Sequence, residues 1–260
     1  MTWLLALGVL ASTGPVQSAL PGVQDFHWKG RIPVGKAIEI VGVNGDVEAT
    51  GSPGVEVEVT AVKRGRRSDP EDVTIEVVEH DDGVTICAVY PSWRRGRPNE
   101  CRPGGKGHMD THDNDVHVRF TVRVPAGVRF VGRTVNGDVD ARQLGAAAEA
   151  YTVNGSITLE TRSYGSATTV NGSIDARLGD AAWSGEVEFE TVNGSIVLVL
   201  PANASADVRA STVNGDITTD FPLTIRGRFG PRRLTGTIGD GGRNLSLQTV
   251  NGDMEIRKRG

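Results

Sequence analysis

The stretch TVNGSI, found at residues 152–157 and again at residues 169–174, decides the fold. The pattern Val-Asn-Gly, then Asp or Ser, then Val, Ile or Met occurs seven times, and a threonine precedes every copy except the first. From the second copy onward the asparagines lie 18, 17, 22, 21 and 37 residues apart. Repeats of about 20 residues are typical of stacked supersecondary units. The expected corners of the stack are Asn44, Gly45, Asn136, Gly137, Asn154, Gly155, Asn171, Gly172, Asn193, Gly194, Asn214, Gly215, Asn251 and Gly252.

The alternation of residues around the motif favours a β-solenoid that resembles a parallel β-helix. Val153, Ile157 and Leu159 share one parity, whereas Thr152 and Ser156 share the other. A two-residue Asn-Gly hairpin would break this phase. Coils about 4.8 Å apart would instead stack the motif valines inside and the asparagines at a corner, where glycine supplies a left-handed conformation. A three-residue loop also preserves parity, so an antiparallel β-meander or sandwich is the alternative.

The regions around the repeats predict further strands and a division of the chain. Alternating segments at residues 55–62, 73–78, 84–89 and 116–124, separated by polar turns, are typical of antiparallel strands. Residues 221–225 and 236–239 predict an extra hairpin before the final coil, which we expect to end the stack. The chain is therefore predicted to be all-β, with an N-terminal β region (20–128) that holds the first repeat and a solenoid region (129–260).

Residues 1–19 are interpreted as a signal peptide. The apolar run from Trp3 to Ala11 is too short to span a bilayer but fits the hydrophobic part of a secretory signal, and small residues offer cleavage near Ser18 or Ala19. No Lys or Arg precedes the run, which is unusual for such a signal. No later segment predicts a membrane span. A periplasmic, secreted or cell-surface location is therefore expected.

The two cysteines, Cys87 and Cys101, have 13 residues between them. In an oxidising compartment such a pair is expected to form a disulfide, whereas in the cytosol both would remain free thiols. Closing a loop of about 15 residues contributes about 3 kcal/mol in the chain-entropy model. The cysteines therefore support the interpretation that the chain is exported.

Composition excludes some functions. The formal charge is −4 and the pI is near 5.8, so a dedicated nucleic-acid binder is not expected. Glycine provides 34 of the 260 residues, which indicates many turns, and aromatic residues make up only 5%. The sequence contains no nucleophile elbow, phosphate loop or conspicuous carboxylate pair. We therefore predict a protein that is not an enzyme and has no cofactor.

One histidine-rich segment carries ligand chemistry. His108, His112 and His117 lie within ten residues, together with Asp110, Asp113 and Asp115, and could bind a divalent ion. The alternative is a solvated polar loop that leads into the following strand, and we expect metal binding to be weak or absent. Calcium at the Asn-Gly-Asp copies is not favoured, because three of the seven copies carry Ser in place of Asp.

The repeats, the segment Val122-Arg-Val-Pro-Ala-Gly127 and the segment Gly239-Asp-Gly-Gly242 are similar to the β-strand-repeat family of bacterial candidate adhesins, whose function is undefined. The resemblance covers residues 25–258. It implies an exported bacterial protein with a β-solenoid body and assigns no catalytic residues.

The function expected from these observations is a non-catalytic β-repeat protein of the bacterial envelope, either a structural protein or an adhesion-type binding module. Its partner would be an envelope or surface ligand, a glycan or a protein. Basic groups at residues 63–67, 94–97 and 226–233 could contact acidic polysaccharide or lipid headgroups, or simply be solvated turns. The alternatives are a polysaccharide-active enzyme on a β-helix and a metal-binding envelope protein.

Overall fold

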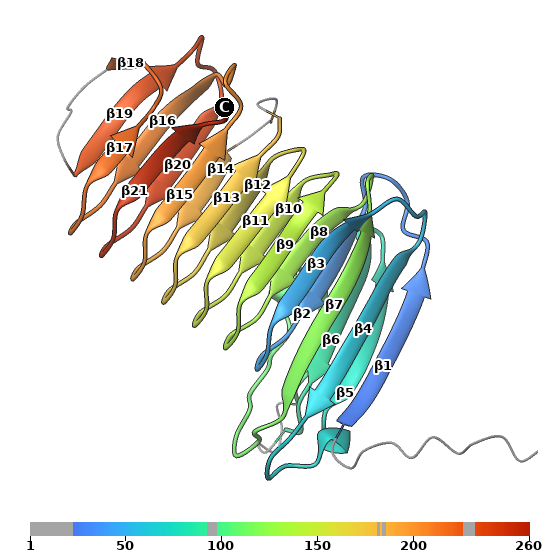
Figure 1. The fold of residues 1–260 in the computed structure, drawn as a ribbon. Coiled ribbons are helices and arrows are strands. Elements are labelled where there is room, and N and C mark those ends of the chain that lie inside the picture. The colour runs from blue at the N-terminus through green and yellow to red at the C-terminus, as the bar shows by residue number, and fades with distance from the viewer. Residues whose placement is uncertain (1–22, 93–97, 181–182, 184–185, 226–231) are drawn as a thin grey trace, which may run out of the picture.

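The computed structural model describes residues 23–92, 98–180, 183, 186–225 and 232–260. The predicted signal peptide, residues 1–19, lies outside these ranges. The described chain forms two long β-sheets that face each other across one apolar core (Figure 1). Most neighbouring strands are parallel, and the only helical elements described are two short 3-10 turns, Pro70–Asp72 and Pro103–Gly105. The β-solenoid prediction is therefore confirmed.

Sheet 1 has ten strands in the described part of the chain. Their spatial order is β1 (Val23–Gly30), β4 (Val57–Arg64), β7 (His117–Pro125), β3 (Val47–Ser52), β9 (Val139–Leu144), β11 (Ile157–Thr161), β13 (Ile174–Leu178), β15 (Ile196–Leu200), β21 (Met254–Lys258) and β17 (Ile217–Thr219).

Sheet 2 has eleven described strands. Their order is β18 (Leu223–Ile225), β19 (Arg233–Ile238), β16 (Ala206–Ser211), β20 (Asn244–Gln248), β14 (Glu186–Glu190), β12 (Gly165–Thr168), β10 (Ala148–Tyr151), β8 (Arg129–Arg133), β2 (Ala37–Val41), β6 (Gly83–Val89) and β5 (Thr74–His80).

Each motif connects a strand of sheet 2 to a strand of sheet 1. The two strands and the motif between them form one layer of the stack. The first layer that contains a motif is β2–β3, and the motif layers β8–β9, β10–β11, β12–β13 and β14–β15 follow it in space and in sequence. Parallel bridges join the motif asparagines of successive layers, for example Asn136 to Asn154 and Asn154 to Asn171. The motifs therefore form one continuous edge of the molecule, visible in Figure 1 as a row of sharp bends.

The N-terminal region is only partly antiparallel. The predicted antiparallel pairing is confirmed for β4 with β1 and β7, and for β5 with β6. However, β6 and β7 also pair in parallel with β2 and β3. They form an additional layer in which residues 90–116 replace the Asn-Gly corner, and both sheets run through the boundary at residue 128 without a break. Periodicity alone did not reveal this, because parallel and antiparallel strands alternate in the same way.

The expected order of the last two layers is wrong. Asn251 is bridged to both Asn193 and Asn214, so the final motif lies inside the stack and the Asn214 motif lies at its end. Accordingly, β21 separates β15 from β17, and β20 separates β14 from β16. The predicted hairpin is present as β18 and β19, whose second strand pairs with β16. After β15 the chain therefore leaves one layer position empty and forms the terminal layer with β16 and β17. It then returns, and β20 and β21 occupy the position between the two layers.

The last residue of each motif begins an apolar ladder in the core. Register aligns Val139 with Ile157, Ile157 with Ile174, Ile174 with Ile196, and Ile196 with Met254. All five side chains are buried, and a second ladder two residues further along each strand is buried as well. Because equivalent positions stack directly, the period-2 pattern of one layer is continued by the next.

Val43 of the first motif is buried in the core as expected, but most of the later motif valines do not face the core, contrary to the expectation from parity. Val135, Val153 and Val170 are 37–38% exposed, and Val213 is 55% exposed. The preceding threonines, such as Thr152 and Thr169, are buried instead. The chain changes from one sheet to the other within the motif, so the alternation of a straight strand does not continue through it.

Each buried threonine bonds to the neighbouring layer. Thr152 Oγ1 donates to the carbonyl oxygen of Gly137 at 2.8 Å, and Thr169 Oγ1 donates to that of Gly155 at 2.9 Å. The same contact is made by Thr134, Thr191, Thr212 and Thr249. Only the first motif lacks the threonine, and the layer before it has no motif glycine to accept such a bond. This contact explains why a threonine accompanies the later repeats.

In the middle layers the motif glycines are required by close approach rather than by a left-handed backbone. A Cβ on Gly172 would lie 2.0 Å from the carbonyl oxygen of Gly155, and a Cβ on Gly194 would lie 1.9 Å from that of Gly172. Neither glycine is among the described residues with positive φ, and neither is any motif asparagine. The predicted left-handed corner is therefore wrong for these layers, which stack too closely for any side chain at this position. Positive φ is found at the motif glycines nearer the two ends of the stack, Gly45, Gly137, Gly215 and Gly252.

Side chains on both sides of each glycine continue the stack at the surface. Asn154 Nδ2 donates to Asn136 Oδ1 at 2.9 Å, and the series extends through the motif asparagines to Asn214. Except in the terminal Asn214 motif, the Asp or Ser after each glycine accepts a bond from the backbone N–H of the next layer, as Asp138 does from Ser156. Both residue types offer an oxygen acceptor here, which explains why either is found.

Candidate functional site

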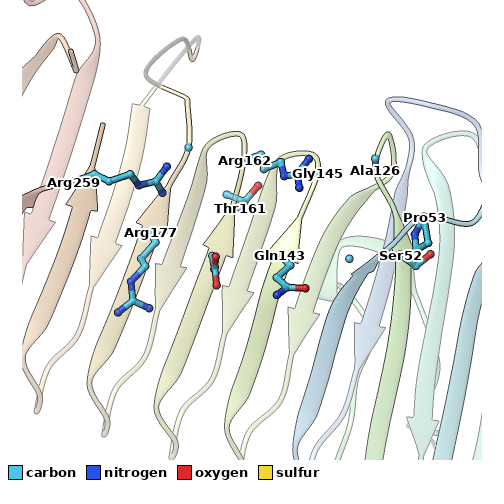
Figure 2. Close-up of a pocket in the computed structure, with 12 residues that line it drawn as sticks. Ser52, Pro53, Ala126, Gln143, Gly145, Thr161, Arg162, Arg177 and Arg259 are labelled. Atoms are coloured by element: carbon cyan, nitrogen blue, oxygen red, sulfur yellow. The ribbon is translucent and has the colours of Figure 1, made fainter. Parts of the chain in front are cut away.

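A groove crosses the stack on the edge opposite the Asn-Gly corners, where each strand of sheet 1 turns back towards sheet 2. Its volume is about 780 Å³. Figure 2 shows its lining side chains arranged along successive layers. The lining residues are Gly51, Ser52, Pro53, Ala126, Gln143, Gly145, Glu160, Thr161, Arg162, Arg177, Gly179 and Arg259. The groove therefore belongs to the repeat architecture and spans layers from β3 to β21.

Close stacking of the return turns shapes the groove. Thr161 Oγ1 donates to the carbonyl oxygen of Ala146 at 2.6 Å, and Arg162 N donates to that of Leu144 at 2.8 Å. These bonds hold the turn after β11 against the turn after β9. A Cβ on Gly179 would lie 2.5 Å from Cα of Arg162, so the next turn also stacks in close contact. The Arg162 side chain is consequently carried on a backbone that is bonded on one side and packed on the other.

Gln143 occupies a β-bulge in the floor of the groove. The register between β9 and β11 shifts after Leu159, and Gln143 has a φ of 55°, in the left-handed region that non-glycine residues rarely adopt. Its carbonyl oxygen fits against Gly51, where a Cβ would lie only 1.9 Å away. A bulge turns a side chain away from the regular alternation, and here it places the Gln143 amide on the groove.

The charge of the groove is predominantly positive. Three guanidinium groups, from Arg162, Arg177 and Arg259, line it together with one carboxylate, from Glu160. Arg177 is 3.5 Å from Asp175 on its own strand, whereas Arg259 extends back across β15 to the carbonyl oxygen of Leu178 at 3.4 Å. Within the described residues, neither Arg162 nor Arg259 forms an ion pair. The arrangement can therefore bind an anion without first breaking an ion pair at these two residues.

Sequence analysis missed this site because its arginines are far apart in the chain. The basic groups singled out there were residues 63–67, 94–97 and 226–233, and most of the last two lie outside the described residues. The repeat itself did indicate the site, because Arg162 and Arg259 each lie eight residues after a motif asparagine and so occupy equivalent positions in their repeats. Residues at equivalent positions of successive repeats lie along the same edge of the molecule when the layers stack.

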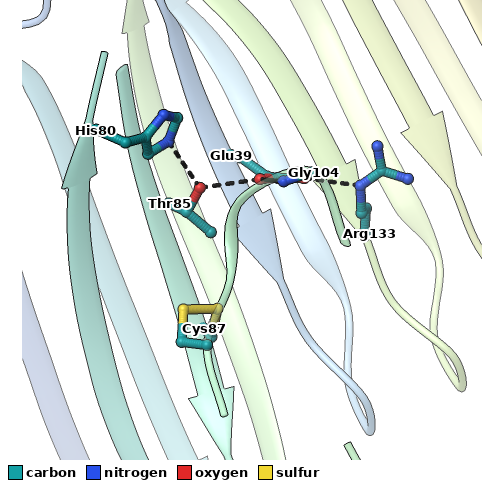
Figure 3. Close-up of a disulfide and its surroundings, with 7 residues drawn as sticks. Glu39, His80, Thr85, Cys87, Gly104 and Arg133 are labelled. Atoms are coloured by element: carbon teal, nitrogen blue, oxygen red, sulfur yellow. Dashed lines mark hydrogen bonds and ion pairs between the residues drawn. A yellow bond between two sulfur atoms is a disulfide. The ribbon is translucent and has the colours of Figure 1, made fainter. Parts of the chain in front are cut away.

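A second feature is the loop of residues 98–107, which a disulfide attaches to sheet 2. Cys87 on β6 is bonded to Cys101, with a Cα–Cα distance of 5.6 Å (Figure 3). Nearby, Glu39 is buried and accepts three bonds: from Arg133 Nε at 2.8 Å, from Thr85 Oγ1 at 2.9 Å and from the Gly104 N–H at 2.7 Å. The loop therefore covers a carboxylate whose charge is matched by Arg133.

The same network extends along the face of sheet 2. Because the Thr85 hydroxyl donates to Glu39, the bond of 3.0 Å between Thr85 Oγ1 and His80 Nε2 is donated by His80. The guanidinium carbon of Arg133 lies 4.0 Å from the centre of the Tyr151 ring. Burial, with a contribution from the Glu149 carboxylate, raises the pKa of Tyr151 to about 12. Arg133 thus faces a neutral ring on one side and a carboxylate on the other, which is a structural role.

The structure places the three candidate metal ligands apart from one another. His108 lies in the loop after the disulfide, His112 Nε2 contacts Asp113 at 3.2 Å, and His117 begins β7 opposite Arg64. In the described ranges, no three His, Cys, Asp or Glu side chains form a group that could hold a metal ion.

Asp115 fixes the end of this segment instead. Its carboxylate accepts bonds from the backbone N–H groups of Ser68, at 2.9 Å, and Arg67, at 3.2 Å. These bonds, first that from Ser68, lower the pKa of Asp115 to about 2. The segment between the disulfide and β7 is therefore tied to the turn that follows β4.

The stacked sheets, motif corners and polar groove define a β-solenoid-like repeat protein. The chain belongs to the Toastrack DUF4097 family, whose sequence profile matches residues 105–257. No curated protein matches the chain. No helix in the described ranges is long and apolar enough to cross a membrane.

Several solved structures match this chain at low sequence identity and with TM-scores below 0.5. A candidate cell adhesion protein from Clostridium sporogenes is 10% identical, with 91% of this chain and 100% of that chain covered and a TM-score of 0.49. A candidate adhesin from Bacteroides fragilis is 11% identical, with 91% and 97% covered and a TM-score of 0.37. A candidate lipid-binding protein from Parabacteroides distasonis is 11% identical, with 93% and 99% covered and a TM-score of 0.27.

Proposed function

We propose that this chain is an exported, non-catalytic binding module of the bacterial cell envelope or surface. The observation that carries the proposal is the groove, whose charged side chains are held by layers that bond to each other at both edges. A repeat stack of this kind presents an extended, preorganised surface, which lowers the entropy lost on binding.

The composition of the groove supports binding rather than catalysis. Hydrolysis of a glycosidic bond generally uses two carboxyl groups on either side of the bond, whereas Glu160 is the one carboxylate among the described residues that line the groove. The disulfide between Cys87 and Cys101 supports an oxidising location outside the cytosol. Both observations agree with a module that holds a ligand without transforming it.

The proposal can be tested with a chain that begins at residue 20. The fluorescently labelled protein should bind saturably to envelope fractions of the source bacterium, and the same protein unfolded by heat should not bind. Incubation with a panel of polysaccharides should release no new reducing ends. Absence of saturable binding would contradict the binding role, and release of reducing ends would identify an enzyme instead.

A further inference from the structure

We propose that the groove binds an extended acidic glycan, a chain of sugars that carry carboxylate groups, laid across the layers of sheet 1. The inference rests on the proposed function and adds the chemical class of the ligand and the residues that recognise it. Arg162 and Arg259 provide the principal charges, and Gln143, Ser52 and Thr161 provide neutral polar groups around them.

Guanidinium groups fit carboxylates especially well. The planar fork of an arginine can donate two parallel hydrogen bonds to one carboxylate, and it is less strongly hydrated than an ammonium group. Arg162 is exposed, and Arg259 is held to the Leu178 carbonyl by one long bond, so most of its donors remain available. Glu160 is the opposing charge in the groove, and it should repel an anionic ligand.

The other lining residues favour a sugar over a lipid. The described lining offers amide, hydroxyl and backbone groups but no aromatic or long aliphatic side chain. An acyl chain would therefore find only small apolar side chains, those of Pro53 and Ala126, whereas sugar hydroxyls would find several donors and acceptors. Binding sites for lipids are lined mainly by hydrophobic and aromatic side chains, whereas Pro53 and Ala126 are the apolar side chains in the described lining of this groove.

The shape of the groove favours a polymer over a small ion. It follows the return turns across layers whose strands are spaced by about 4.8 Å, so an extended ligand meets side chains from several layers in turn. Arg162 belongs to the turn after β11, and Arg259 follows β21 but reaches β13. Two guanidinium groups from different layers can therefore contact successive charges of one chain.

The bulge at Gln143 is an independent indication of a binding site. Residues with φ in the left-handed region that are not glycine carry a conformational cost, and such residues cluster at functional sites. Gln143 and Asp113 are the two described examples in this protein, and only Gln143 lies within a sheet and lines the groove. The glycine at position 51 accommodates the bulge, so both residues contribute to the floor of the groove.

The test measures binding of a fluorescein-labelled hexamer of galacturonic acid to the chain that begins at residue 20. Arg162→Gln and Arg259→Gln should each raise the Kd about tenfold, the effect of losing one charged contact. The matched control is Arg257→Gln, which removes the same charge from the same strand region but outside the groove, where Arg257 pairs with Glu255. The control should leave the Kd unchanged, and Glu160→Gln should lower it several-fold.

Three further probes identify the ligand class: maltohexaose, inorganic polyphosphate, and vesicles that contain phosphatidylglycerol. Maltohexaose should bind at least tenfold more weakly than the galacturonate hexamer, and the variants should not alter vesicle binding. An equal loss in the Arg257 variant would show general charge attraction and overturn the proposal. Tighter binding of polyphosphate or of vesicles, lost in the groove variants, would replace the glycan by a phosphate ligand.

The same variants separate this inference from the proposed function. If the wild-type chain binds envelope fractions and the Arg162 and Arg259 variants bind equally well, the groove assignment fails while the binding role stands. If the wild-type chain does not bind envelope fractions, the proposed function fails. Unchanged thermal midpoints in all four variants, all of which alter exposed or half-buried side chains, ensure that differences in Kd do not arise from unfolding.

Discussion

The carbonyl oxygen of Gly155 accepts a 2.9 Å hydrogen bond from Thr169 Oγ1, in the next layer of the stack. The same oxygen lies 2.0 Å from where a Cβ on Gly172 would be. One backbone oxygen therefore accounts for two residues of the following repeat: a threonine that donates to it and a glycine that leaves space for it.

We expect Thr169→Val to destabilise the protein by about 1–3 kcal/mol, because the substitution keeps the shape of the side chain but leaves the Gly155 carbonyl without its donor. Thr158→Val, on the outer face of β11, is the control and should change the free energy of unfolding by less than about 0.5 kcal/mol. Denaturant melts of both variants provide the comparison. Equal effects would show that the bond between layers contributes nothing measurable.

The order of the layers predicts which glycines tolerate a side chain. Gly172→Ala and Gly252→Ala should each cost about 2–4 kcal/mol, because both residues lie inside the stack and the new methyl group would overlap a backbone oxygen. Gly215→Ala should cost about 1 kcal/mol or less, since among the described strands β17 pairs only with β21 and can separate from the end. A larger loss for Gly215 than for Gly252 in the same melts would contradict the order of the layers.

Reduction of the disulfide should lower stability by about 3 kcal/mol, the value expected for closing a loop of about 15 residues. The denaturation midpoint should fall when a phosphine reductant is added. A variant with both Cys87→Ser and Cys101→Ser should show the lower midpoint with or without the reductant. A midpoint in the wild type that does not respond to complete reduction, verified by thiol titration, would show that the loop is held by its other contacts.

Sequence analysis predicted the local features of the fold better than its long-range order. Stacking of the motifs, the hairpin of β18 and β19 and the pairing of Cys87 with Cys101 each depend on short spacings or on one repeated pattern. The exchange of the Asn214 and Asn251 layers depends on which strands pair over long distances, and identical motifs carry no information about their order. The outward direction of Val153 was missed because parity was extended through a corner where the chain changes sheets.

The groove was missed for a related reason. Arg162 and Arg259 are separated by most of the solenoid in sequence, and the short basic run Arg257-Lys258-Arg259 was not singled out as a candidate site. Their proximity arises only from stacking, together with the reach of Arg259 across β15. A search for charged residues at equivalent positions of the repeats would have identified the edge of the stack that carries the groove. It would not have identified the bulge at Gln143, whose φ follows from packing against Gly51.

Stability should depend on pH through Asp115. Its folded pKa of about 2 is below the ordinary value of 3.8, so its contribution is complete above about pH 4 and disappears as the pH falls towards 2. The stability difference between the wild type and Asp115→Asn should therefore shrink over that interval. Asp81→Asn, in the exposed turn between β5 and β6, is the control for the loss of one surface carboxylate. A difference that stays constant from pH 5 to pH 2 would contradict the role of the bonds from Ser68 and Arg67.

The position of β20 and β21 inside the stack separates the order of synthesis from the order of assembly. A ribosome completes the Asn214 motif 37 residues before the Asn251 motif, yet the earlier strand β17 has no described neighbour in sheet 1 until the later strand β21 is present. The far end of the molecule can therefore form its native sheet only after β20 and β21 have been translated. A chain cut short by proteolysis or premature termination would expose unpaired edges on β14 and β15, the kind of surface that promotes aggregation and that cellular quality control removes.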